Sequence, residues 1–412
     1  MKKTVSLLAA SVLSISLLAG CGSGDNAGGA DNGKVKIEFF HYKREAMDTF
    51  DKLIEKFEKE NPNIDIEQAS PPDAGTVIKT RVSKGDVPDI ISIGGDMGYN
   101  ELSKAGVFTD LSKDKVLEKV QPAYIQMLKD ITGQEKIYGV PFAANAVGVI
   151  YNKAIFNELG LEVPKTWDEF VALSETIQKA GKVPFYHTYK DAWTLLPSFN
   201  ALAANTQGAD FYEQLNKGKV LAEKRYKEAV EKMVVLSKYG HKNQQGVAYN
   251  DGNTAFANGE SAMYLQGIWA IPEIIKANPD IELGVFPFPA TNNPEEIKVI
   301  SGVDLLYALS AKSEHPKEAK KFIEFMLQDE NAKQYIEEQN AFSALMGIAQ
   351  DNPTVADLKV MMENGAVTDF PDHYIPTGVY PDKTLQTLAQ DKDVDSALEK
   401  IQKDWEKVQS RK

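Results

Sequence analysis

Cysteine and histidine are scarce in this chain. Its 412 residues include a single cysteine, Cys21, and five histidines. One cysteine cannot form a disulfide within the chain. The histidines are His41, His187, His241, His315 and His373. None of them lies in an HExxH pair or at another close spacing that is typical of metal ligands. The sequence therefore predicts neither a metal site nor a bound cofactor.

Long apolar stretches are missing as well, apart from one near the start. Residues 5–18 form an uncharged, largely apolar run behind Lys2 and Lys3. At roughly 14–17 residues this run is short for a membrane-spanning helix, which needs about 20. A basic start followed by a short apolar core is typical of a bacterial export signal. We therefore expect residues 1–20 to be a signal peptide that is removed.

The apolar run ends at residues 18–21 (LAGC), which look like a lipobox. Cys21 would then carry lipid and begin the mature protein, anchored at the outer face of the bacterial cell membrane. Lipidation leaves no thiol for catalysis or zinc binding. Residues 22–33 are rich in Gly, Asn and Asp and cannot bury a core, so residues 21–33 are expected to be a lipidated, flexible tether. The alternative is an ordinary secretory signal with a chance cysteine.

Positive charge is in short supply. The chain has 46 Lys and Arg against 59 Asp and Glu, a net charge of −13, and loss of the two leader lysines takes it to −15. A nucleic-acid partner would need a basic face, so the net charge argues against nucleic acid as a partner. The net charge also argues against binding of anionic lipid through a polybasic segment. Membrane attachment therefore depends on the lipid at Cys21.

The remaining sequence is that of a globular protein, with 43% hydrophobic and 25% charged residues. Its length exceeds what one ordinary core accommodates, so two domains are expected. Strand-like patterns are found at 35–40, 64–66, 89–93, 147–151, 261–265, 281–286 and 305–309. Helical patterns are found at 50–57, 74–84, 166–180, 223–238, 251–258 and 317–328. This alternation predicts an α/β fold with right-handed βαβ units.

Polar residues follow two of the predicted parallel strands. Tyr42, Lys43 and Arg44 follow the first strand and compete for one site role, and Asp96 follows the third. Ligands of open parallel sheets bind beyond the carboxyl ends of the strands, so these side chains are candidate ligand-binding residues. The alternative role for Asp96 is the N-cap of a helix that begins at Met97.

Several motifs, taken together and in order, resemble the extracellular solute-binding proteins of carbohydrate ABC importers. The motifs are 85–91 (GDVPDII), 99–111 (YNELSKAGVFTDL), 138–141 (YGVP), 164–170 (PKTWDEF), 255–269 (AFANGESAMYLQGIW), 301–304 (SGVD) and 315–319 (HPKEA). The resemblance covers about 35–405 and extends to maltose-binding protein and multiple-sugar-binding proteins. It implies two α/β lobes joined by crossing strands, with the ligand in the cleft between them.

The resemblance also implies a domain division and a function. It places lobe one at 34–144 plus 300–348, and lobe two at 145–299 plus 349–412. A monomer would capture a neutral sugar by hinge closure and deliver it to two permease subunits in the membrane. The ATPase of the importer would be involved only indirectly. No chemistry on the ligand is expected, which agrees with the absence of a Gly-x-Ser-x-Gly elbow and of a P-loop.

Site residues follow from the resemblance position by position. Asp96 matches the family's cleft aspartate, although Met97 stands where maltose-binding protein has an arginine. Asn145 falls beside a crossing strand, where an amide can donate to and accept from a hydroxyl. Trp269 matches a tryptophan whose face covers a sugar ring. The remaining candidates are Trp193 on a loop of lobe two, Asp304 at the second crossing, and either Tyr374 or Tyr380 as a further stacking aromatic.

Two alternatives stay open. An exported glycoside hydrolase would need two carboxylates about 5–10 Å apart, which sequence spacing does not exclude. The same fold could also bind a polyamine, a metal complex or a phosphodiester. A site for a cation would require several carboxylates in the cleft, and a site for a phosphate would require an Arg/Lys cluster. The expected mixture of aromatic, amide and acidic side chains favours a neutral polyol instead.

Overall fold

The computed structural model describes residues 33–207, 214, 217 and 222–411. The predicted signal peptide, Cys21 and nearly all of the tether lie outside these residues. Residues 35–412 form one compact unit. Over the described ranges, every helix is too short or too polar to cross a membrane.

The larger sheet combines parallel and antiparallel strands, with seven strands in the part of the chain that the structure describes. These are β1 (Val35–His41), β2 (Ile64–Ala69), β3 (Ile90–Ile93), β4 (Val140–Val147), β8 (Val299–Leu309), β9 (Phe342–Ser343) and β10 (Val367–Thr368). The order is β2-β1-β3-β8-β4-β9, and β10 also pairs with β8. Strand β1 runs parallel to β2 and β3, and β8 runs antiparallel to β3 and β4.

The predicted βαβ units are confirmed at the start of the chain. Helices α1 (Met47–Glu60) and α2 (Ala74–Ser83) connect the parallel strands. The apolar stripe of α1 is buried, because Phe50, Leu53 and Phe57 face the core with no exposed surface. Burial of such side chains contributes about 1.5–3 kcal/mol each. The helical period of the sequence therefore sets which face of α1 covers the sheet.

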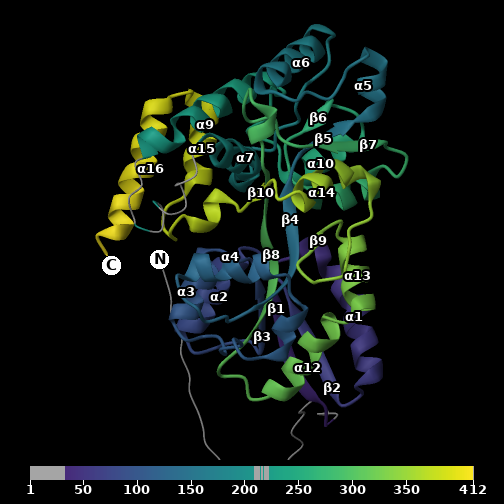
Figure 1. The fold of residues 1–412 in the computed structure, drawn as a ribbon, viewed down its shortest axis with the longest axis vertical. Coiled ribbons are helices and arrows are strands. Elements are labelled where there is room, and N and C mark those ends of the chain that lie inside the picture. Colours follow the sequence, from purple (N-terminus) through teal and green to yellow (C-terminus); the bar gives the residue numbers. More distant parts are fainter. Residues whose placement is uncertain (1–32, 208–213, 215–216, 218–221, 412) are drawn as a thin grey trace, which may run out of the picture. The chain divides into compact units, whose positions relative to one another are not determined.

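The smaller sheet is antiparallel and has the order β6-β5-β7. Its strands are β5 (Val149–Asn152), β6 (Met263–Tyr264) and β7 (Leu283–Phe286). The surrounding helices are α5 (Lys153–Leu159), α6 (Trp167–Lys179), α7 (Leu196–Thr206), α9 (Ala222–Leu236), α10 (Tyr249–Ala257) and α11 (Ile271–Ala277). Figure 1 shows this sheet with α5 and α6 at one end, and β1 to β3 at the other. Strands β4 and β8 run between the two ends.

The long strands β4 and β8 were only partly expected. The predicted strand at 147–151 spans the end of β4 and most of β5, with a break at Gly148. A side chain at Gly148 would lie 2.6 Å from Val285 Cγ1, so only glycine lets the chain pass from one sheet to the other. The predicted strand at 305–309 is the second half of β8, and its first half was missed because Ser301 and Gly302 interrupt the apolar pattern.

Helix ends follow local sequence signals. The capping box of α6 is confirmed, because Thr166 Oγ1 accepts from the Glu169 amide (3.3 Å) and the Glu169 carboxylate accepts from the Thr166 amide (3.2 Å). Gly181 follows the helix with a φ of +80°, the left-handed geometry expected of a C′ glycine. Helices α9, α10 and α12 (Pro316–Met326) lie within two residues of their predicted bounds.

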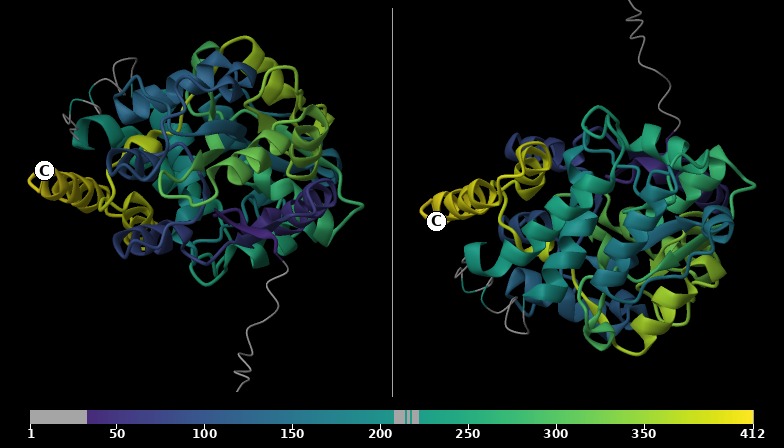
Figure 2. Two further views of the ribbon diagram at one scale, coloured as in Figure 1. Left: turned by 90° about the horizontal axis from the view of Figure 1, so that it is seen from below. Right: turned by 90° about the horizontal axis from the view of Figure 1, so that it is seen from above.

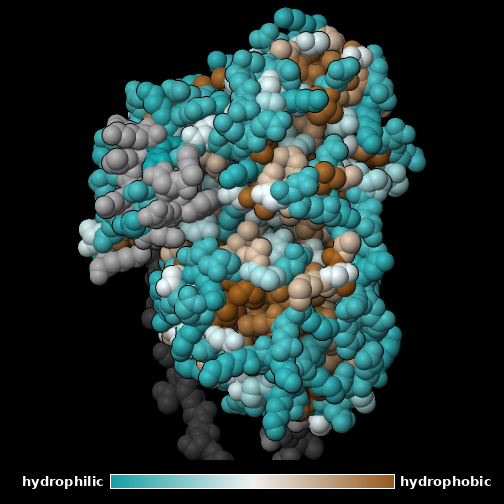
Figure 3. Space-filling model, in the orientation of Figure 1, coloured by the Kyte–Doolittle hydropathy of each residue, from teal (hydrophilic) through white to brown (hydrophobic). Residues whose placement is uncertain are grey.

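The C-terminal third is mostly helical, as predicted. Its helices are α13 (Asp329–Glu338), α14 (Ala356–Glu363), α15 (Pro381–Asp391) and α16 (Val394–Gln409). Helix α16 packs against α9 and α15, and Figure 2 shows it in yellow at the margin of both views. In Figure 3, hydrophilic residues cover most of the visible face, and hydrophobic residues are concentrated near its middle.

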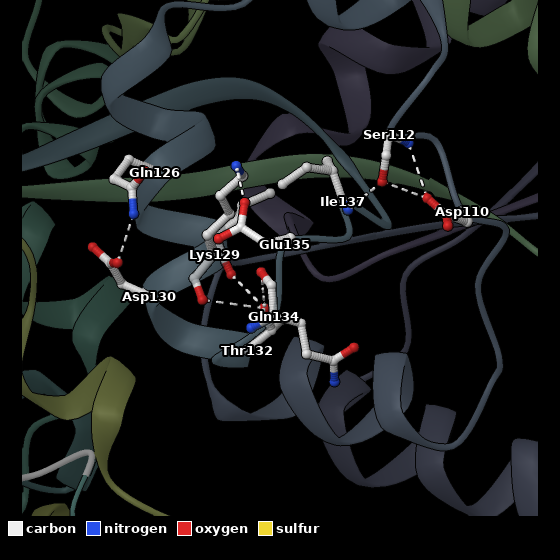
Figure 4. A network of polar contacts seen from close by, with 10 residues as sticks. Asp110, Ser112, Gln126, Lys129, Asp130, Thr132, Gln134, Glu135 and Ile137 are labelled. Carbon is white, nitrogen blue, oxygen red and sulfur yellow. Dashed lines mark hydrogen bonds and ion pairs between the residues drawn. The ribbon is translucent and has the colours of Figure 1, made fainter.

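A polar network holds the loop that leads into β4 (Figure 4). This loop follows α4 (Pro122–Thr132), which succeeds α3 (Met97–Lys104). Ser112 Oγ accepts from the Ile137 amide at 3.0 Å and donates to Asp110 at 2.5 Å. Lys129 at the end of α4 pairs with Glu135 in the loop at 2.6 Å. These contacts fix the start of β4, the strand that carries Asn145.

Candidate functional site

A cavity of about 1180 Å³ opens beyond the carboxyl ends of β1 and β3. Ligands of open α/β sheets bind in this position. Eight of the ten predicted ligand-binding residues line the cavity, namely Tyr42, Lys43, Arg44, Asp96, Asn145, Trp193, Trp269 and Asp304. Tyr374 and Tyr380 are not among the lining residues. The topology thus brings together side chains that are up to 262 positions apart in the sequence.

Asp304 of β8 is held by two residues that follow β1. Its Oδ1 accepts from the Tyr42 hydroxyl at 2.7 Å, and its Oδ2 lies 2.6 Å from Lys43 Nζ. Burial would lower the pKa of Lys43, but Asp304 and the nearby Glu45 carboxylate raise it, so Lys43 stays charged. Burial and Asp304 raise the pKa of Tyr42 well above its usual range, so its hydroxyl remains a donor. Arg44 lines the cavity from the short helix η1 (Arg44–Ala46).

Asp96 caps a helix and also lines the cavity. Its Oδ1 accepts from the amides of Gly98 (2.7 Å) and Tyr99 (3.1 Å), which makes it the N-cap of α3. A side chain at Gly95 would lie 2.9 Å from Val303 Cβ, so glycine lets the turn approach β8 closely. Within the described residues, Asp96 Oδ2 has no hydrogen-bond partner. The carboxylate therefore caps a helix with one oxygen and can serve a ligand with the other.

Asn145 lies in the middle of β4, opposite Gly302 of β8. The side chain lines the cavity although the residue is only 5% exposed. No described residue forms a hydrogen bond with its amide group. An unpaired amide offers both donors and an acceptor, which is the combination that a ligand hydroxyl can use.

Two tryptophans give the cavity an aromatic surface. A side chain on Gly267 would lie 1.8 Å from Cζ3 of Trp269, so the indole lies directly on the glycine backbone. This explains the Gly-x-Trp spacing at the short helix η5 (Ile268–Ala270). Trp193 is 40% exposed, and its ring centroid lies 4.8 Å from that of Tyr249, which also lines the cavity. The aromatic faces suit the C–H faces of sugar rings.

The sequence analysis missed part of the cavity wall, contributed by the short helix η8 (Pro371–Tyr374) and the residue before it. Phe370, Asp372 and His373 line the cavity there. Tyr374 instead donates to Asp369 Oδ2 at 3.0 Å, and Tyr380 is 57% exposed at the start of α15. The segment has no periodic pattern. The one feature of the sequence that could have indicated a site here is the presence of aromatic, acidic and imidazole side chains within the five residues 370–374.

Charge in the cavity wall is nearly balanced. The acidic lining residues are Glu45, Asp48, Asp96, Asp191, Glu273, Asp304 and Asp372. The basic ones are Lys43, Arg44, Lys79, Lys276 and His373. In the part of the chain that the structure describes, no three acidic, histidine or cysteine side chains are grouped so that they could hold a metal ion. This balance suits a neutral ligand better than a polyvalent cation or anion.

Comparisons with known proteins agree with this geometry. A family model described as bacterial extracellular solute-binding protein matches residues 42–333. The multiple sugar-binding protein of Streptococcus mutans is 37% identical over 85% of this chain and 84% of its own. The melibiose/raffinose/stachyose-binding protein MelE of Bacillus subtilis is 26% identical over 84% of this chain and 81% of its own.

A solved structure supports the same assignment. The solute-binding protein RafE in complex with raffinose is 32% identical, with a TM-score of 0.82, and the match covers 90% of this chain and 99% of RafE. The family model spans more than half of the chain, and the similarity to the Streptococcus mutans protein extends over most of both sequences. This chain belongs to the bacterial extracellular solute-binding proteins, a family of binding proteins rather than enzymes.

Proposed function

We propose that this protein is the substrate-binding component of an ABC importer and captures a neutral oligosaccharide in the cavity. The observation that carries the proposal is that one cavity is lined both by Trp269, whose indole lies against Gly267, and by Asn145, whose amide has no hydrogen-bond partner among the described residues. Stacking covers the apolar face of a sugar ring, and amide and carboxylate groups bind its hydroxyls.

The cavity and the relatives favour an oligosaccharide over a monosaccharide. Its volume of about 1180 Å³ is above the usual range for small-molecule sites, about 300–1,000 Å³. Room for more than one sugar ring is therefore available. RafE was solved with raffinose, and the name of MelE includes raffinose and stachyose. These two sugars are the first ligands to test.

The two-lobe division is part of the proposal. Lobe one (34–144 plus 300–348) would contribute Asp96 and Asp304, and lobe two (145–299 plus 349–412) would contribute Trp193 and Trp269. The ligand would then be held between them, and closure would be a hinge motion. Lys79 of α2 donates to Thr377 at 3.1 Å, a contact that would join the proposed lobes at the rim of the cavity.

Attachment and delivery complete the proposal. The LAGC sequence supports lipidation of Cys21, which would anchor the protein to the outer face of the cell membrane. Residues 21–33 would then act as a flexible tether that lets the binding unit move above the bilayer. Loaded protein would dock on two permease subunits, and the ATPase would act from the other side without contacting it.

Isothermal titration calorimetry with a ligand panel tests the proposal. The panel contains glucose, maltotriose, raffinose, stachyose, spermidine and inorganic phosphate. We expect saturable binding of at least one oligosaccharide, with no cleavage products by chromatography after prolonged incubation. Binding of spermidine or phosphate without any sugar would contradict the sugar assignment. Turnover of a sugar would contradict the assignment as a binding protein.

A further inference from the structure

The missed segment places an imidazole in the cavity wall and fixes its orientation. His373 Nδ1 lies 2.9 Å from Asp369 Oδ1, and the ring stacks on Phe370 with centroids 4.8 Å apart and an angle of 28°. Gly302 of β8 leaves space for this pair, because a side chain there would lie 2.1 Å from Asp369 Oδ1. No described residue forms a hydrogen bond with His373 Nε2. The nitrogen that remains for a ligand is therefore Nε2.

Asp372 is held just as firmly beside it. Asn200 of α7 donates to Asp372 Oδ1 at 3.0 Å and accepts from the Asp372 amide at 3.1 Å. Asn200 is 2% exposed, so this double contact is shielded from solvent. Among the described residues, Asp372 Oδ2 has no hydrogen-bond partner. Each of these two cavity-lining residues thus has one side-chain atom bound within the protein (His373 Nδ1 and Asp372 Oδ1). The other side-chain atom (His373 Nε2 and Asp372 Oδ2) can bind a ligand.

The charges around His373 favour its protonated form. Burial would lower the pKa of this imidazole, but the carboxylates of Asp369, Asp372 and Asp96 raise it to about 9. The hydroxyl of Tyr374 also faces this cluster through Asp369. Burial of Tyr124 on α4 raises the pKa of its hydroxyl, so this neighbour stays neutral at the pH values of interest.

Protonation decides what Nε2 can do. With Nδ1–H donating to Asp369, a neutral imidazole would present Nε2 as an acceptor, and only the charged ring presents it as a donor. We propose, building on the sugar-binding function proposed above, that His373 and Asp372 bind one sugar hydroxyl between them, His373 Nε2–H donating to its oxygen and Asp372 Oδ2 accepting its proton. A hydroxyl both donates and accepts, so it can satisfy both partners at once.

A pH dependence of affinity follows. Sugar binding needs the proton on Nε2, so affinity is full below the pKa of free His373 and decreases above it. With that pKa at about 9, the association constant should fall as pH rises from 8 to 10 and approach tenfold per pH unit. The pKa values of Lys43 and Tyr42 are raised from their ordinary values, so these residues keep their protons over this range.

Calorimetric titrations of raffinose from pH 6.5 to 10 test this assignment, or of the panel sugar that binds most tightly if raffinose is not that sugar. Wild-type protein should lose affinity above pH 9. His373→Gln should bind about tenfold more weakly at pH 7, with no alkaline loss, since an amide does not titrate. Asp369→Asn should shift the loss to lower pH, because the charge that holds the proton is gone. His315→Gln, a matched change outside the cavity, should behave as wild type.

The pH profile decides the outcome. An alkaline loss that persists in His373→Gln, or that is absent from wild-type protein, overturns the assignment while leaving sugar binding intact. Should His373→Gln fail to fold, the shift in Asp369→Asn decides, and an unshifted profile overturns the assignment. If wild-type protein binds no sugar of the panel at any pH, the proposed function fails, and this assignment fails with it.

Discussion

At the scale of single residues, Asp96 links helix stability to the cavity. One oxygen caps α3 through the amides of Gly98 and Tyr99, and the residue also lines the cavity. Replacement by alanine therefore removes two contributions at once. Replacement by asparagine separates them, since asparagine caps helices as well as aspartate does but carries no charge.

We predict different results for the two Asp96 variants. Asp96→Ala should lower the free energy of unfolding by about 1 kcal/mol through loss of the cap. It should also weaken sugar binding by about 1.5–3 kcal/mol, the range for a hydrogen bond to a charged group. Asp96→Asn should keep the stability and weaken binding. Urea denaturation and calorimetry measure the two effects, and equal destabilisation by both changes would contradict the capping role.

The Gly267–Trp269 contact gives a second prediction at this scale. Trp269→Ala should weaken sugar binding by about 2 kcal/mol or more, as for a buried aromatic anchor. Gly267→Ala should produce a loss of similar size, because its methyl group would occupy the place of the indole ring. Calorimetry measures both losses, and circular dichroism checks the fold. Val360→Ala, exposed and outside the cavity lining, is the control. Unchanged affinity in folded Trp269→Ala would mean that the indole only packs.

At the scale of elements, the sequence predicted the pieces with strong periodicity. The stripe of α1, the capping box of α6 and the buried run of β3 are local patterns, and the structure confirms them. The strands β4 and β8 were predicted only in part. Their polar and glycine positions, such as Asn145 near the cavity and Gly302 opposite it, interrupt the apolar pattern from which strands are predicted. The η8 segment was not predicted as part of the site, because its position depends on tertiary contacts with Asn200 and β8 that have no local sequence pattern.

Asn340 shows how elements are joined near the site. It follows α13 with a φ of +50°, donates to the Ile268 carbonyl at 3.2 Å and accepts from Asn352 at 2.7 Å. Ile268 directly precedes Trp269. This one side chain therefore ties the end of α13 to the backbone that carries the cavity tryptophan.

We predict that Asn340→Ala lowers the free energy of unfolding by about 2–4 kcal/mol. The buried hydrogen bond to Ile268 and the partly buried one from Asn352 are lost, at about 0.5–1 kcal/mol each. Alanine adds a cost of roughly 1–2 kcal/mol in the left-handed region. Asn340→Gly removes the same hydrogen bonds without the backbone strain, so it should be the less destabilised of the two. Urea denaturation of both variants measures the difference, and equal stability would contradict the role of the left-handed backbone.

At the scale of the whole molecule, we propose that a lipid on Cys21 anchors the binding unit to the membrane. We predict that Cys21→Ser releases the protein into the medium or leaves the leader uncleaved, since the modified thiol is lost. Membrane fractionation and metabolic labelling with palmitate measure this outcome. Val360→Ala, which leaves the lipobox unchanged, is the control. A Cys21→Ser protein that still partitions with membrane and carries label would contradict the anchor.

We propose that a neutral sugar occupies the cavity and stacks on Trp269. A crystal structure of the protein grown with raffinose, or with the panel sugar that binds most tightly, would show where the sugar lies. We expect density for a sugar ring against the indole of Trp269, with hydroxyls within hydrogen-bond distance of Asn145 and Asp96. Density for the sugar elsewhere on the protein, with the cavity occupied only by water, would show that the cavity is not the sugar-binding site.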